Sequence, residues 1–312
     1  MASKLLNKPF LTVCMNPTIQ KTLVFSSLIK DTVNRCGEYR LDASGKGINV
    51  SRVLSQLGKE VCHLTQLGGV LRPLFLELCG HDNLKVEWVE SSSPIRFAYT
   101  LIERAEKTVT EIVEEAEKVG EGTEKRLLEK FSVLVSGFST LIISGTNAAG
   151  FSDALIPEMV RIARAEDLRI ILDVRGQDLI NSLVFGPDII KPNLSEFITT
   201  FAPELLLQKT ADIADIKKKV KNIWAELYNK YPCTLILTRG ADPLWFAEKG
   251  EFEEYAFEPV EPFNTTGSGD AFTAGLAAAL EQGASLRDAI ANGIRCGTLN
   301  AGLLRPAVIK PI

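Results

Sequence analysis

Histidine is almost absent from this chain, which has only His63 and His81 among 312 residues. Neither has a metal-ligand partner at a useful spacing, which argues against zinc sites and His-based catalytic triads. The six cysteines are scattered and form no CxxC pair, so we expect reduced thiols that pack as small hydrophobic side chains. The chemistry therefore has to come from carboxylates, lysines, arginines or backbone amides.

The sequence also lacks long apolar runs and long basic runs. No stretch of 18 or more uninterrupted apolar residues occurs, which argues against a membrane span. The N-terminal residues show no apolar core with a small-residue cleavage site, so we expect a cytoplasmic protein. A net charge of −4 without a basic stripe argues against a nucleic-acid partner.

Short apolar runs alternate with helix-like stretches along the chain. Several runs are nearly continuous, which is typical of parallel strands buried on both faces. This alternation predicts an α/β protein with a doubly wound, mostly parallel sheet in three αβα layers, as one domain over residues 1–312. The expected strands are 10–14, 61–66, 140–144, 169–173, 188–191 and 234–238, and the expected helices include 48–57, 152–166, 212–228 and 269–281.

Two segments break this rhythm, residues 21–41 and residues 95–113. Each alternates apolar and polar side chains, as strands with one solvated face do. We expect them to form a small second sheet that acts as a lid over the site or as the surface of a homodimer. The alternative is a pair of hairpins without a functional role.

The strongest local signal is NTTGSGDAFTAG at residues 264–275. Gly267 and Gly269 permit tight backbone geometry, and the segment enters an alanine-rich helix whose first N–H groups are free. Amides and helix dipole together form an anion site, and Asp270 in the first turn can accept the proton of an attacking hydroxyl. A plain turn at a helix start is the alternative, and the segment matches neither GxxxxGK[ST] nor GxGxxG.

A second glycine-rich element, SGKGIN at residues 44–49, also opens a helix and offers amides, a lysine and an asparagine. Together the two elements resemble the PfkB family of ribokinase-like carbohydrate kinases, and the resemblance covers almost the whole chain. Five motifs occur in the family's order: NPTIQ at 16–20, GKGINVSRVLSQLG at 45–58, KPNLSE at 191–196, TRGAD at 238–242 and TTGSGD at 265–270.

This resemblance implies a site, residue by residue. Asp270 is expected to be the catalytic base, with Gly267, Ser268 and Gly269 as the anion hole. ATP and Mg²⁺ are the implied cofactors, with the metal held by Glu196, through water. The nucleotide site is implied at Lys191, Asn193, Glu196, Thr238, Arg239, Gly240 and Gly269, and the acceptor site at Gln20, Gly45, Lys46, Asn49 and Arg96.

The implied activity is transfer of the γ-phosphoryl group of ATP to a hydroxyl of a phosphorylated ketohexose. GKGINVSRVL and the NP opening resemble the subgroup that phosphorylates fructose 1-phosphate, tagatose 6-phosphate or fructose 6-phosphate, with fructose 1-phosphate preferred. Lys46 and Arg96 suit an acceptor that carries its own phosphate. Gln20 stands where the family has an aspartate, and residues 144–150 lack its prolines. Because of these departures, a metabolite sensor with weak catalysis on the same fold remains the alternative function.

Overall fold

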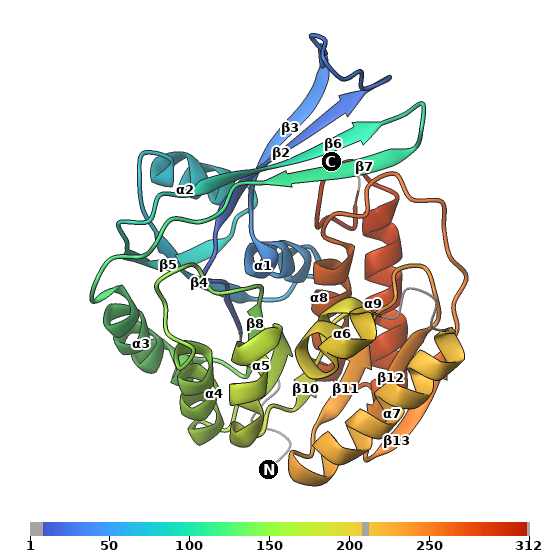
Figure 1. The fold of residues 1–312 in the computed structure, drawn as a ribbon. Coiled ribbons are helices and arrows are strands. Elements are labelled where there is room, and N and C mark those ends of the chain that lie inside the picture. The colour runs from blue at the N-terminus through green and yellow to red at the C-terminus, as the bar shows by residue number, and fades with distance from the viewer. Residues whose placement is uncertain (1–8, 208–211, 311–312) are drawn as a thin grey trace.

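A nine-stranded sheet runs through the centre of the computed structural model, which describes residues 9–207 and 212–310 (Figure 1). The strand order is β13-β12-β11-β10-β9-β8-β1-β4-β5. The strands are β1 (Phe10–Val13), β4 (Val61–Leu67), β5 (Lys85–Glu90), β8 (Thr140–Ser144), β9 (Arg169–Asp173), β10 (Ile189–Ile190), β11 (Thr234–Leu237), β12 (Leu244–Glu248) and β13 (Glu251–Tyr255).

The sheet is parallel from β11 to β5, and β12 and β13 add antiparallel strands at one edge. Strand β1 pairs with β4 on one side and β8 on the other, so the direction of winding reverses beside it. A crevice opens beyond the carboxyl ends of parallel strands at such a switch point, and ligands of doubly wound proteins bind there.

Helices cover both faces of this sheet, which confirms the predicted three-layer α/β architecture. Side chains of one strand alternate between two cores: Leu11 joins one buried cluster and Phe10 the other. This is why the strands are nearly continuous apolar runs. One face carries α1 (Lys46–Gln56), α8 (Ser268–Glu281) and α9 (Leu286–Ala301), and the other carries α3 (Thr123–Leu134), α4 (Leu155–Ala165), α5 (Gly176–Ser182), α6 (Leu194–Phe201) and α7 (Ile213–Lys230).

A separate four-stranded sheet stands at one end of the molecule, at the top of Figure 1. Its order is β3-β2-β6-β7, with β2 and β6 parallel and the outer pairs antiparallel. Strand β3 is exposed where it begins and buried where it ends. On the other edge strand, Glu111 of β7 accepts a hydrogen bond of 3.0 Å from Oγ1 of Thr266, and Lys107, in the turn before β7, pairs with Glu261. The strands are β2 (Thr18–Phe25), β3 (Glu38–Ser44), β6 (Arg96–Glu103) and β7 (Thr108–Val113).

Smaller elements complete the fold. Helix α2 (Arg72–His81) packs against β3 and β5 and joins the core beneath the second sheet. Short 3₁₀ turns lie at Val135–Gly137, Leu183–Phe185 and Pro203–Leu207. Within residues 9–207 and 212–310, helices that combine the length and the apolar character needed to cross a bilayer are absent.

Candidate active site

Two helices begin at the same cleft, at the crevice between β1 and β8. Gly45 is the N-cap of α1 with a φ of 111°, and Gly267 is the N-cap of α8 with a φ of 82°. Both angles favour glycine, which lacks the Cβ atom that strains such a backbone. The free N–H groups of two helix N-termini are thereby brought to one place, where they favour an anion.

Asp270 in the first turn of α8 meets Asn49 of α1 across this cleft. The Nδ2 of Asn49 donates a hydrogen bond of 2.8 Å to Oδ2 of Asp270. Only 6% of Asp270 is exposed, and burial raises the pKa of its carboxyl to about 7, with Asp173 acting in the same direction. Lys46, Asn49 and Lys191 oppose this rise. A carboxyl with a pKa near neutrality is well matched to accept a proton at pH 7.

A buried ion cluster lies beside Asp270 and is centred on Asp173, at the carboxyl end of β9. The Nζ of Lys191 is 3.2 Å from its Oδ2, and the Nζ of Lys46 is 3.5 Å from its Oδ1. Ser144 and Thr273 donate hydrogen bonds of 3.2 and 3.3 Å to Oδ2. Burial alone would raise the pKa of Asp173, but Lys191 and Lys46 hold it below its ordinary value. Asp173 therefore stays charged and fixes both lysines at the cleft.

The backbone at Gly267 is enclosed by the segment that follows α9. A Cβ atom at Gly267 would lie 2.6 Å from the backbone nitrogen of Ala307. Side chains near this segment are tied to the helices, since Ser268 Oγ donates to Asn300 and Asn300 Nδ2 donates to the Arg305 carbonyl. The N–H of Ser268 donates to the Thr265 carbonyl at 3.1 Å, so the anion-hole role that we predicted for Ser268 requires this bond to open.

A second cleft adjoins the first and shares residues with it. Helix α6 begins with a capping box in which the N–H of Asn193 donates to Glu196 at 2.9 Å and the N–H of Glu196 donates to Asn193 at 2.8 Å. Asn193 also bridges to Thr238 after β11, which brings the KPN and TRG segments together. Apolar side chains line the far side, as suits a planar base: Phe257, Pro259, Val260, Pro262 and Ile294.

Arg239 lines this second cleft, but its guanidinium is directed to the protein. It lies 4.2 Å from the ring centroid of Trp245, and Nη1 donates to the Pro243 carbonyl at 3.0 Å. Asp242 lies 3.7 Å from Nη2. The side chain therefore shapes the wall of the cleft, and the neighbouring turn at Gly240 has a φ of 64°.

The second sheet supplies the outer wall of the first cleft. Gln20 on β2 is 5% exposed, and its Nε2 donates to Oγ1 of Thr100 on β6 at 2.7 Å. Arg96 at the start of β6 donates from Nη1 to the Glu114 carbonyl. Its Nε is buried and has no hydrogen-bond partner among the described residues.

The structure thus gathers the predicted residues into two adjoining clefts. The first is lined by Gln20, Gly45, Lys46, Asn49, Arg96, Lys191, Asn193, Glu196, Thr238, Gly267, Gly269 and Asp270. The second is lined by Asn193, Thr238, Arg239, Gly240, Ser268 and Gly269. Sequence reasoning missed Asp173 and Arg175, which also line the first cleft. The available signal was a carboxylate that ends a buried strand, since strand ends meet at the switch point.

Two helix N-termini and a buried carboxyl at one cleft, with an apolar cleft beside it, suit a phosphotransferase that acts on an alcohol. Residues 13–304 match the pfkB family carbohydrate kinase domain, and the chain belongs to this family. The predicted family and class of enzyme, a carbohydrate kinase that uses ATP, are confirmed.

Curated relatives cover most of the chain at low identity. A tagatose-6-phosphate kinase of Staphylococcus epidermidis is 26% identical over 93% of this chain and 91% of its own length. A 1-phosphofructokinase of Borreliella burgdorferi is 27% identical over the same shares. The fold is that of Escherichia coli phosphofructokinase-2 in complex with fructose-6-phosphate, with a TM-score of 0.79 at 20% identity over 94% of each chain.

Proposed function

We propose that this kinase transfers the γ-phosphoryl group of Mg·ATP to a hydroxyl of a phosphorylated ketohexose, with fructose 1-phosphate as the preferred acceptor. The observation that carries the proposal is the contact of Asn49 with the buried Asp270 between the N-termini of α1 and α8. The named activities of the two curated relatives support a sugar phosphate as the acceptor.

The roles follow from the positions of the side chains. Asp270 accepts the proton of the attacking hydroxyl, and the N–H groups at Gly267 and Gly269 stabilise the charge on the transferred group. Lys46 lies beside both Asp173 and Glu196, so its ammonium is fixed where the acceptor and donor meet. Phosphoryl transfer has a loose transition state, and positioning of this kind accounts for most of the catalysis.

Magnesium fits this site through one carboxylate. Glu196 uses Oε2 for the capping box and pairs through Oε1 with Lys46 at 3.2 Å, so its carboxylate is fixed beside the cleft. Among the described residues, no cluster of three or more His, Cys, Asp or Glu side chains could hold a metal alone. Mg²⁺ keeps several waters and binds through one or two carboxylates and substrate phosphates. Glu196 would hold it through water, and the metal would neutralise charge on the phosphates.

The proposal is tested by measuring ADP release with Mg·ATP against fructose 1-phosphate, fructose 6-phosphate, tagatose 6-phosphate, fructose and ribose. A preference for fructose 1-phosphate supports the full proposal, and a preference for another ketohexose phosphate corrects the acceptor. Turnover of only fructose or ribose contradicts the phosphorylated acceptor. No turnover by a folded protein that still binds ATP would favour the metabolite sensor.

Arg96 is the proposed partner of the acceptor's own phosphate, since Lys46 is paired with two carboxylates while the Arg96 Nε has no hydrogen-bond partner among the described residues. Arg96→Met is therefore expected to raise KM for the sugar phosphate by about 10-fold or more, as loss of a charge-assisted hydrogen bond does. KM for ATP is expected to stay unchanged.

The matched control for this substitution is Arg104→Met. Arg104 follows β6 on the same sheet, and its guanidinium pairs with Glu38 at 2.6 Å on the surface. Steady-state kinetics with both substrates varied compare the two variants. Equal effects of Arg96→Met on both KM values would remove the basis for a phosphate contact at Arg96.

The pH dependence of the reaction is expected to follow Asp270. Only the carboxylate can accept the hydroxyl proton, and burial raises the pKa of Asp270 to about 7. The rate is therefore lost as the pH falls through 7 and reaches a plateau above it. Profiles of kcat/KM between pH 5.5 and about 9 would show a single ionisation in this limb; a flat profile would contradict Asp270 as the base.

We also propose that the second sheet closes over the site and pairs with a second copy of the chain. Tyr39 on β3 and Ile112 on β7 expose apolar side chains at 62% and 52%. Exposed apolar strands of this kind are stabilised by a partner surface. A form of Escherichia coli phosphofructokinase-2 is described as tetrameric, which supports self-association of this fold.

A further inference from the structure

Arg52, a buried arginine of α1, touches the residue that holds Asp270. It is 1% exposed, and its Nη1 donates to Oδ1 of Asn49 at 3.0 Å. Ser44 adds a longer hydrogen bond of 3.3 Å to the same oxygen. The other end of this amide, Nδ2 of Asn49, donates to Asp270 at 2.8 Å. A chain of hydrogen bonds therefore runs from Arg52 through Asn49 to Asp270.

This chain determines which way the Asn49 amide points. An arginine has donors only, so the amide must offer its oxygen to Arg52. The amide NH₂ is then left to face the carboxylate. With the amide reversed, its NH₂ would meet a guanidinium donor and its oxygen would meet the Asp270 carboxylate, which are two repulsive contacts. Arg52 therefore excludes the orientation that could not stabilise the base.

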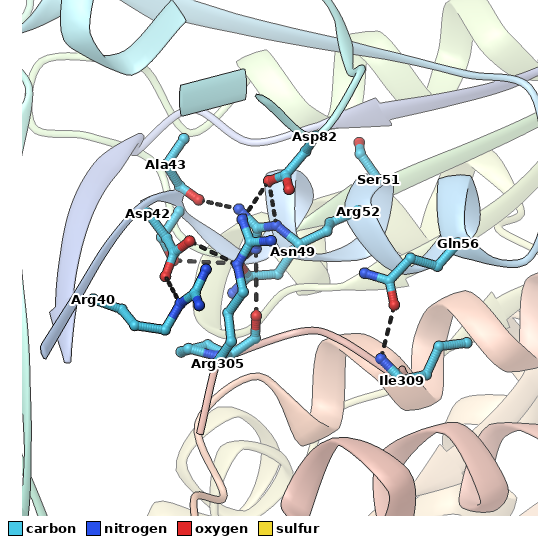
Figure 2. A network of polar contacts seen from close by, with 12 residues as sticks. Arg40, Asp42, Ala43, Asn49, Ser51, Arg52, Gln56, Asp82, Arg305 and Ile309 are labelled. Carbon is cyan, nitrogen blue, oxygen red and sulfur yellow. Dashed lines mark hydrogen bonds and ion pairs between the residues drawn. The ribbon is translucent and has the colours of Figure 1, made fainter. Parts of the chain in front are cut away.

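Arg52 is itself held on three sides, as Figure 2 shows. Its Nε donates to Oδ2 of Asp82 at 2.7 Å, and its Nη2 donates to the Ala43 carbonyl at the end of β3. The carbonyl of Pro306, beyond α9, lies 3.5 Å from Nη1. The guanidinium is thus fixed by the end of α2, by the second sheet and by the last described segment of the chain.

Arg305 belongs to the same network but makes no hydrogen bond to Asn49. Its Nη2 donates to Asp82 Oδ2 and its Nε to Asp42 Oδ1, each at 2.7 Å (Figure 2). Two arginines of similar burial therefore share one aspartate, and only one of them bonds to the amide that holds the base. A buried ion pair of this kind does not by itself stabilise the folded protein, so the network is compatible with a positioning role for Arg52.

We propose that Arg52 is a positioning residue for the phosphoryl transfer, acting through Asn49 to orient and stabilise the carboxylate of Asp270. This inference rests on the proposed role of Asp270 and extends it to a residue that does not line either cleft. The charged groups that act on Asp270 are Lys46, Asp173 and Lys191, and a substitution of Arg52 leaves all three in place.

The test compares Arg52→Met with Arg305→Met. Arg52→Met frees the Asn49 amide, so kcat on the pH plateau is expected to fall by about 10- to 100-fold, as misplacement of a catalytic group does. The acid limb of the pH profile of kcat is expected to move to higher pH, because the hydrogen bond from Asn49, which the variant weakens, lowers the pKa of Asp270. Arg305→Met removes the same charge from the same network and is expected to lower Tm without moving the limb.

Arg52 would be only structural if the acid limb of the pH profile of kcat stayed in place in folded Arg52→Met. The same conclusion would follow if Arg305→Met shifted this limb equally. If Arg52→Met does not fold, Arg52→Lys keeps a cation for Asp82 but loses the forked donors. An unshifted limb in Arg52→Lys then overturns the proposal, and a shifted one supports it.

A readout without substrate separates this inference from the proposed function. The difference in Tm between a protein with Asp270 and the same protein with Asp270→Asn grows with pH and levels off at the pKa of Asp270 in the folded state. Arg52→Met is expected to move this levelling-off pH upward even if no sugar phosphate is turned over. A levelling-off pH that stays in place overturns the positioning role, whatever the acceptor.

Discussion

Asp270→Asn is expected to lower kcat by about 10²- to 10⁴-fold, the range that a positioned general base contributes, while ATP binding persists. Asparagine keeps the shape of the side chain and can still accept the hydrogen bond from Asn49, but it cannot take the hydroxyl proton. Turnover and ATP-dependent thermal stabilisation would be measured on the same preparation. A folded Asp270→Asn enzyme with near-normal kcat would contradict the assigned base.

The same variant is expected to be more thermally stable than the parent at alkaline pH. The pKa of Asp270 rises from its ordinary 3.8 to about 7 on folding, so the folded state binds a proton that the unfolded chain has lost. This stabilising proton is fully present below pH 3.8 and is lost as the pH rises through 7. The difference in Tm between Asp270→Asn and the parent should therefore grow up to neutral pH and then level off.

Gly267→Ala is expected to lower kcat by about 10²- to 10³-fold, the cost of removing one donor of an anion hole. Its φ of 82° strains any residue with a Cβ atom, and that atom would lie 2.6 Å from the backbone nitrogen of Ala307. Relief of the clash has to move the first turn of α8 or the segment at Ala307. Either movement displaces the N–H groups that are proposed to face the transferred phosphoryl group. Single-turnover rates at saturating substrates would measure the loss.

Gly283→Ala provides the control for backbone strain alone. Gly283 has a φ of 81°, and a Cβ atom there would meet no heavy atom within 4 Å. This variant is expected to lose stability by about 1 to 2 kcal/mol, the cost of a left-handed residue, and to keep its kcat. Equal losses of kcat in the two variants would mean that strain, and not the displaced amides, explains the effect at Gly267.

Much of the fold could be predicted because buried parallel strands leave a local signal. The expected strands 140–144 and 169–173 coincide with β8 and β9, and the expected helix 269–281 differs from α8 by one residue. Strand β5 carries charged and polar side chains at the edge of the sheet, so its pattern is weak. The antiparallel strands β12 and β13 and the helices α2, α5, α6 and α9 were not among the elements named from the sequence.

Some residues of the site could be predicted from local motifs, and others depend on contacts between distant parts of the chain. Asp270, Lys46 and Asn49 lie in glycine-rich motifs at helix starts, where the function of a residue can be read from its neighbours. Asp173 lies at the first cleft, and two of its partners, Lys46 and Thr273, are 100 or more positions away in the chain. These contacts depend on which loops the sheet brings together, and no contiguous pattern records that. Arg52 lies inside the GKGINVSRVLSQLG motif, yet its hydrogen bond to Asn49 could be seen only in the structure.

The anchoring of β3 at one end has a mechanical consequence for the second sheet. Asp42, near the end of β3, is bound to Arg305, and the pairing register places Gln20 opposite Asp42 and Arg96 opposite Thr18. The proposed closure of the second sheet would then be a rotation about this base, and it would break or remake the exposed ion pair between Lys107, in the turn before β7, and Glu261. Displacement would grow with distance from the base, so the rim would move further than Gln20 and Arg96. Discrimination between acceptors and access of water to the cleft could then change independently.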